Sequence, residues 1–81
     1  MQLLSNAIRD HIKELMQQQN LNVSELAKQS GLTQSTVDSV LHTHNTNPRL
    51  DTIHKIIKAL NQSISEFFNH TRFKDLEYPQ I

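Results

Sequence analysis

The chain contains no cysteine and very little glycine, proline or aromatic side chain, and its charges balance. The absence of cysteine excludes disulfide bonds and thiolate zinc sites. One glycine and two prolines among 81 residues are too few for the turns of a β-sandwich or barrel, so short helices are favoured. A formal net charge of zero counts against a polyanionic partner, although five histidines can gain positive charge beside one.

Size and side-chain chemistry narrow the function further. A mass of 9.4 kDa is that of one small domain with a single core and no room for an enclosed substrate cavity. The sequence has no glycine-rich phosphate loop and no paired carboxylates in an apolar setting, so we expect neither an enzyme nor a cofactor. The opening MQLLSNAIRD is unlike a signal peptide, and no apolar run approaches the roughly 20 residues that span a bilayer. These features predict a cytoplasmic protein without a membrane partner.

The spacing of apolar residues predicts that the chain begins with two helices. Apolar side chains three and four positions apart indicate a first helix over about residues 4–19, with Ser5 as its N-cap. The polar run 17–20 is interpreted as the frayed, solvated end of this helix. Asn22 and Glu25 have the spacing of a capping box, which predicts that a second helix begins there.

Three more helices follow in the same way. Thr33 is predicted to cap a third helix that ends near His42, and a polar loop then leads to a fourth helix over residues 50–60. Ser63 and Glu66 form a second capping-box pattern, which predicts a short fifth helix. The chain is therefore predicted to be all-α.

The single glycine, Gly31, separates the second and third helices at the position where a helix end commonly takes left-handed geometry. Two helices joined in this way form either an ordinary αα-corner or a helix-turn-helix that binds DNA. Ala27 is expected at the closest approach of the helices, and Val37 in the angle between them. The other side chains of the third helix are short and polar, as suits base edges in a major groove: Gln34, Ser35, Thr36, Asp38 and Ser39. A helix-turn-helix over about residues 23–42 is favoured.

Two stretches, SELAKQSGLTQSTVDSVL and NPRLDTIHKIIKALNQSISEFF, resemble a known family. Residues 8–68, about three-quarters of the chain, look like the lambda-repressor-like domain, the Cro/C1-type helix-turn-helix of the XRE family. The resemblance implies a compact fold of five short helices. It also implies a transcriptional regulator, usually a repressor, that binds a palindromic operator in double-stranded DNA as a homodimer. The alternative is an antitoxin-type or other protein-interaction module with secondary DNA binding.

The resemblance also implies roles for single residues. Gln34, Ser35 and Ser39 fall where such repressors contact bases, and Gln34 has the amide for a bidentate contact to adenine N6 and N7. Thr33 and Arg49 fall at backbone-contacting positions, and the amide of Asn47 can join Arg49 there. Apart from the resemblance, His42 and His44 are interpreted as facing phosphate, and a solvated role stays open for both. The residues at structural positions of the helix-turn-helix are Ala27, Gly31 and Val37.

Three departures from the family pattern affect the expected operator rather than the fold. Val23 stands where many members have a glutamine that braces the first base contact, so we expect that support to be missing. Thr43 replaces a glycine that usually follows the recognition helix. Asp38 lies one turn after Gln34, where it either accepts a hydrogen bond from cytosine N4 or repels phosphate.

The histidines and the C-terminus leave other interpretations open. His42 and His44, even with His54 or His70, lack a third ligand at fixed spacing, so we predict no metal site. Residues 1–71 are assigned to the DNA-binding domain and residues 72–81 to a tail. The apolar residues of the tail favour a dimerisation arm over a segment folded back on the first helix or a linker to another domain: Phe73, Leu76, Tyr78 and Ile81.

Overall fold

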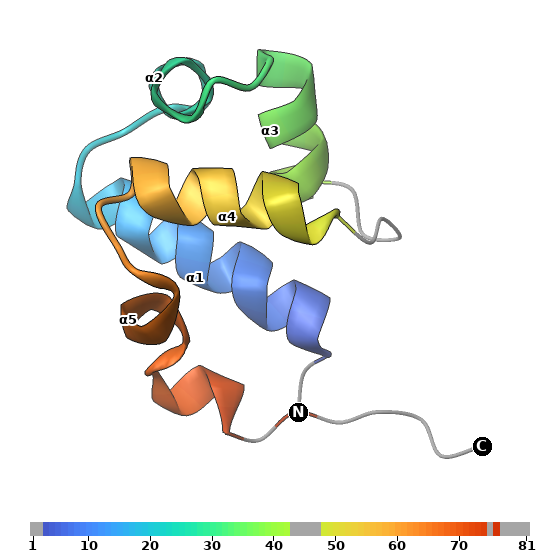
Figure 1. Ribbon diagram of the computed structural model, residues 1–81, viewed down its shortest axis with the longest axis vertical. Coiled ribbons are helices and arrows are strands. Elements are labelled where there is room, and N and C mark those ends of the chain that lie inside the picture. The colour runs from blue at the N-terminus through green and yellow to red at the C-terminus, as the bar shows by residue number, and fades with distance from the viewer. Residues whose placement is uncertain (1–2, 43–47, 75, 77–81) are drawn as a thin grey trace.

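The computed structural model describes residues 3–42, 48–74 and 76, and it confirms the all-α fold of five helices. Figure 1 shows α2 and α3 at one end of the molecule, α4 and α1 across its middle, and α5 toward the opposite end. Helix α3 packs against both α2 and α1. None of the helices in the described part of the chain has the length and apolar character needed to cross a bilayer. The helices, with a final 3₁₀ turn, are α1 (Leu4–Gln18), α2 (Val23–Ser30), α3 (Gln34–His42), α4 (Leu50–Ala59), α5 (Ile64–Phe68) and η1 (Thr71–Phe73).

A single apolar core joins the five helices. Each helix contributes the buried stripe that its apolar spacing predicts, for example Ile12 of α1, Leu26 of α2 and Ile56 of α4, each with no exposed surface. Phe67 of α5 is also completely buried. Because all five helices contribute to the same cluster, the position of α3 is determined by the packing of the whole domain.

The predicted helix starts at residues 22 and 63 are confirmed. Asn22 Oδ1 accepts from the Glu25 N–H at 2.8 Å, and Glu25 Oε1 accepts from the Asn22 N–H at 3.1 Å. Ser63 and Glu66 make the same reciprocal pair at 3.0 and 2.9 Å. The hydrogen bond from the Ser63 N–H stabilises the Glu66 carboxylate and lowers its pKa. Both helices therefore begin with two of their free N–H groups satisfied.

Both ends of α1 differ from the prediction. Ser5 is not the N-cap, because α1 begins one residue earlier and the Leu3 carbonyl accepts from the Ala7 N–H at 3.1 Å. At the other end, Asn20 has left-handed geometry, with φ 55°. Gln19 is not a frayed residue: its Nε2 donates to the Leu60 carbonyl at 2.8 Å. The polar run therefore ties the end of α1 to the end of α4.

Candidate nucleic-acid interface

Gly31 makes the turn between α2 and α3. Its φ of 72° lies in the left-handed region, and the Leu32 N–H that follows donates to the Ala27 carbonyl at 3.0 Å. A Cβ built on Gly31 would meet no atom within 4 Å. A side chain there would therefore be unfavourable because of the backbone conformation alone, since no neighbouring group is in its way.

Ala27 of α2 and Val37 of α3 are both buried in the core. Ala27 is 3% exposed to solvent and Val37 is completely buried. Both belong to the core cluster, together with Leu26 and Val40. This packing sets the position of α3 relative to α2, because a close-packed interface leaves little room for adjustment.

The polar face of α3 is open to solvent. Gln34, Ser35 and Asp38 are exposed and Ser39 is half-buried, whereas Val37 and Leu41 are buried on the opposite face. This face of α3 thus carries the side chains that the sequence suggested for base contacts.

Arg49 lies on the same face as these polar side chains. A shallow hollow brings Ser35 and Ser39 together with Arg49, the residue before α4, and its remaining lining residues are Thr36, Val40, Pro48 and Thr52. A second hollow, between α2 and α3, is lined by Val23, Gln34, Ser35 and Asp38. We call Gln34, Ser35, Ser39 and Arg49 the recognition surface. Two other predicted backbone contacts, Asn47 and His44, lie outside the described residues.

Thr33 and His42 lie at the two ends of α3. The Thr33 Oγ1 accepts from the Thr36 N–H at 3.1 Å, so Thr33 is the predicted N-cap. His42 Nε2 lies 3.5 Å from Asp38 Oδ1, and both side chains are more than half exposed. A protonated His42 would therefore offset part of the negative charge that Asp38 brings to the recognition helix.

Gln34 has a partner that the sequence did not reveal. Its Nε2 donates to Ser24 Oγ at 2.8 Å, which connects the first turn of α3 to the first turn of α2. Val23 has no polar side-chain atom, and the hydrogen bond with Gln34 is made instead by the next residue along the chain.

Arg9 is a second residue that sequence reasoning missed. It is 5% exposed, although arginine is seldom buried without partners. Its Nε donates to the Val40 carbonyl at 3.3 Å, and its Nη1 donates to Asn6 Oδ1 at 2.8 Å. The first of these bonds fastens the C-terminal half of α3 to α1.

Comparisons with known proteins agree with this geometry. Residues 11–72, more than half of the chain, match the Cro/C1-type HTH DNA-binding domain. The chain belongs to the Cro/C1-type helix-turn-helix family. A solved protein, prophage Lp1 protein 11, is similar to this Cro/C1-type chain with a TM-score of 0.77 and 30% identity, over 94% of this chain and all of that one.

Curated relatives of this Cro/C1-type domain are longer proteins. An uncharacterized HTH-type transcriptional regulator of Coxiella burnetii is 31% identical over 93% of this chain and 35% of its own length. The HTH-type transcriptional regulator PuuR of Escherichia coli is 34% identical over 86% of this chain and 36% of its own. The chain thus spans about a third of these relatives.

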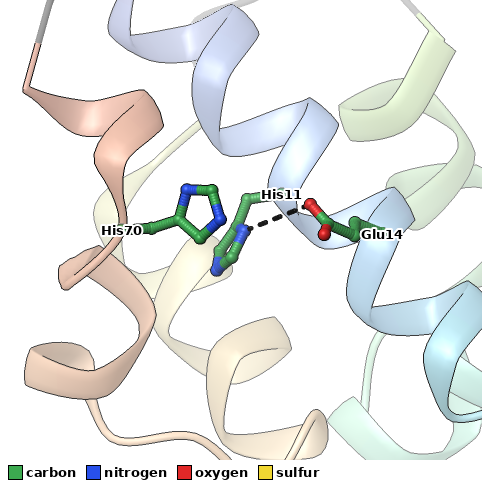
Figure 2. A group of neighbouring side chains, drawn as sticks. All are labelled: His11, Glu14 and His70. Atoms are coloured by element: carbon green, nitrogen blue, oxygen red, sulfur yellow. Dashed lines mark ion pairs between the residues drawn. The ribbon is translucent and has the colours of Figure 1, made fainter.

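This chain also has a second polar cluster, formed by residues that precede and follow the recognition surface in the sequence. His11 and Glu14 of α1 lie beside His70, with ligand-type atoms of all three within 4.8 Å of one another (Figure 2). His11 Nδ1 lies 4.0 Å from Glu14 Oε2. In the part of the chain that the structure describes, this buried nitrogen has no hydrogen-bond partner. Histidine and glutamate side chains are both able to bind metal ions.

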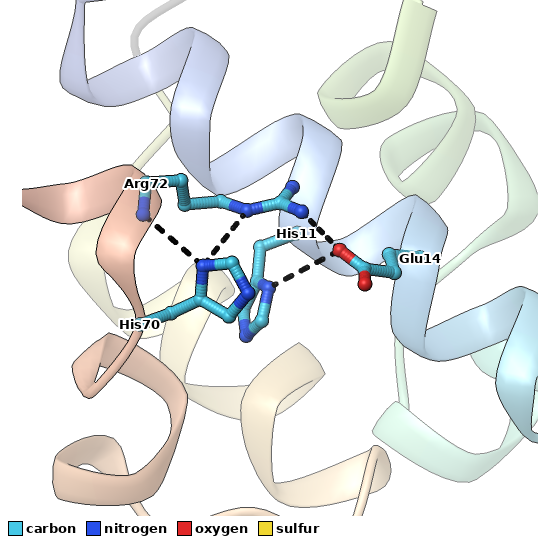
Figure 3. Close-up of polar contacts among 4 residues, drawn as sticks. All are labelled: His11, Glu14, His70 and Arg72. Carbon is cyan, nitrogen blue, oxygen red and sulfur yellow. Dashed lines mark hydrogen bonds and ion pairs between the residues drawn. The ribbon is translucent and has the colours of Figure 1, made fainter.

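Arg72 supplies a positive charge within this cluster. Figure 3 shows its guanidinium reaching from His70 to Glu14: Nε donates to His70 Nδ1 at 3.3 Å, and Nη2 pairs with Glu14 Oε2. The Arg72 backbone N–H donates to His70 Nδ1 as well, at 3.1 Å. We interpret the cluster as an anchor that holds the segment after α5 against α1.

Burial and neighbouring rings complete this anchor. Desolvation lowers the pKa of His11, the positive charge of Arg72 and neighbouring His70 lower it further, and Glu14 opposes them. The His11 ring contacts Phe67 and Phe73 edge-on, with centroids 4.7 and 5.5 Å apart. Phe73 of the predicted tail therefore packs within its own chain.

The rest of the tail is less fully described. Leu76 is half-buried, whereas Tyr78 and Ile81 lie outside the described residues. The dimerisation arm stays a prediction.

Proposed function

We propose that this protein is a sequence-specific transcriptional regulator, a repressor that binds a palindromic operator in double-stranded DNA as a homodimer. The observation that carries the proposal is the recognition surface, where Gln34, Ser35 and Ser39 of α3 share one open face with Arg49. Family membership and relatives named as HTH-type transcriptional regulators support it. In bacteria such as those of the relatives, this activity belongs in the cytoplasm.

Base reading is assigned to the polar face of α3. Gln34 is the first residue of this helix and is exposed, so it can enter a major groove ahead of the helix body. Its amide offers both a donor and an acceptor, which match N7 and N6 of adenine. Ser35 and Ser39 lie one turn apart on the same face and can contact neighbouring bases.

Backbone contact is assigned chiefly to Arg49. Its side chain is exposed, makes no capping hydrogen bond to α4, and forms no ion pair with the described residues. A guanidinium in this position can bind a phosphate oxygen and release counterions. Thr33 and His42, at the two ends of α3, are also proposed to contact the phosphate backbone, as are Asn47 and His44.

A homodimer is proposed because the recognition surface of one copy contacts too few bases for useful specificity. One recognition helix reads only one half-site, and two copies would place their helices about 34 Å apart on successive turns of DNA. Leu50, 85% exposed, immediately follows Arg49 and lines an apolar groove that runs to Ile64, which is 51% exposed. The protruding leucine and the groove lie on the same face, as a two-fold interface requires, so we propose that a second copy covers this groove. The predicted arm, residues 72–81, is the alternative interface.

Selection of bound duplexes from a random library tests the proposed function directly. The expected result is an inverted repeat whose half-site centres are one helical turn apart. Recovery of unrelated sequences, together with a second polypeptide that co-purifies in equal amount, would contradict it and favour the protein-interaction alternative.

A further inference from the structure

We infer that Ser24 is a positioning residue for base recognition, whose hydroxyl holds the Gln34 amide in the place where it can bind adenine. The inference rests on the proposed function and adds a residue that contacts Gln34 rather than the base. It starts from one bond, the 2.8 Å hydrogen bond from Gln34 Nε2 to Ser24 Oγ.

The surrounding structure fixes the distance between these two residues. Ser24 lies in the first turn of α2 and Gln34 opens α3, and the two helices are joined through the left-handed turn at Gly31. Ala27 and Val37 are buried between the helices. The two helix starts are therefore neighbours in the folded domain, ten positions apart in sequence.

The chemistry of the amide leaves the base-reading groups available. A glutamine amide has two N–H donors and one carbonyl acceptor. One N–H is used on Ser24, so the second N–H can donate to adenine N7 while Oε1 accepts from N6. Restraining a flexible side chain before binding reduces the conformational entropy that binding to DNA costs.

Residues on either side of Ser24 do not offer the same support. Val23 has no polar atom in its side chain and packs against the core. The Glu25 carboxylate is engaged in the capping box with the Asn22 N–H. Ser24 is exposed, and its replacement should not disturb the core.

A double-mutant cycle tests this role. Ser24→Ala, Gln34→Ala, the double variant and the conservative Ser24→Thr would be titrated with the selected operator and with duplexes altered at single base pairs. Ser24→Ala should lower the adenine preference at one position by about three- to tenfold, the effect of one net hydrogen bond. Its affinity for scrambled DNA should not change. Ser24→Thr should retain the preference, and the double variant should discriminate no worse than Gln34→Ala.

The control is Ser65→Ala, an exposed serine in α5, which should behave as the wild type in every titration. Thermal melts of all variants establish that they are folded. A Ser24→Ala protein that discriminates as the wild type, or a double variant whose deficit equals the sum of both single deficits, would overturn the role of Ser24 alone. A Gln34→Ala protein with unchanged base preference would instead refute the proposed reading helix, and the role of Ser24 with it.

Discussion

Polar side chains are accessible on the recognition surface, whereas two of those on α1 are buried. Gln34 and Ser35 face solvent at the start of α3, and Arg49 is open beside them. On α1, by contrast, Arg9 and His11 are only 5% and 6% exposed. Residue type alone therefore does not identify an interface, because arginine is a buried hydrogen-bond donor in one region and an exposed, available cation in the other.

The comparison also bears on the neutral charge of the chain. Glu14 and Arg72 pair with each other in the cluster on α1, so their charges largely cancel in the field outside the domain. Arg49 has no such partner among the described residues. A domain with zero net charge can therefore attract DNA through the local placement of its charges.

The largest difference between the two regions should appear in stability. Phe67→Ala removes a completely buried ring that contacts His11 and Phe73, and should lower the free energy of unfolding by about 3–5 kcal/mol. Ser39→Ala, on the recognition surface, should change it by about 0.5 kcal/mol or less. Urea denaturation measures both, and equal losses of stability would mean that the two regions contribute alike to the fold.

A smaller loss of stability is expected at the turn that aims the recognition helix. Gly31→Val should cost about 1–3 kcal/mol, since a β-branched residue is strained at the φ of 72°. Gly31→Asn is the matched control, because asparagine tolerates left-handed geometry and a Cβ meets no neighbour here. Thermal melts in which both variants lose the same stability would show that the backbone conformation is not the cause.

Measurements of dimerisation distinguish the apolar groove from the predicted arm as the interface between two copies. Leu50→Lys places a charge on the rim of the groove and should weaken dimerisation by at least about fivefold, the effect of one significant interface residue. Deleting residues 75–81 leaves Arg72 and Phe73 in place and should have little effect. Sedimentation equilibrium measures both, and the reverse result would assign the interface to the arm.

The smallest effect concerns pH. The folded state lowers the pKa of His11 from 6.5, so the unfolded chain binds its proton at a higher pH than the folded domain. The stabilisation is complete above pH 6.5 and should decrease progressively as the pH falls from there toward the lower, folded value. Urea midpoints of the wild type and of His11→Gln would show this, with a flatter profile in the variant. An unchanged profile would place the pH dependence elsewhere.

Local features of the fold are predictable because neighbouring residues determine them. Apolar spacing predicts the five helices, reciprocal side chains predict two of their starts, and the single glycine predicts the turn. The cap prediction at Ser5 is wrong because a serine near a helix start fits the cap position and the first turn equally well. Helical periodicity alone places the exposed residues of α3 correctly on one face.

Bonds between distant residues could not be predicted. Gln19 donates to a carbonyl 41 positions away, Arg9 to one 31 positions away, and Arg72 pairs with a carboxylate 58 positions away. These bonds depend on how whole helices pack, which no spacing in the sequence reveals. The hydrogen bond between Ser24 and Gln34 belongs to the same class, although the turn between their helices is predictable.

The central claim is that Gln34 contacts bases and Arg49 contacts the phosphate backbone. Binding isotherms test it most directly, measured at several salt concentrations on the selected operator and on a scrambled duplex. Gln34→Ala should reduce discrimination by about 1–3 kcal/mol while its affinity for scrambled DNA stays the same. Arg49→Ala should weaken both duplexes alike and lower the salt slope by about 0.9 for each phosphate that the variant no longer neutralises. If Gln34→Ala weakens both duplexes equally and Arg49→Ala leaves the slope unchanged, α3 does not read bases and Arg49 does not hold the backbone.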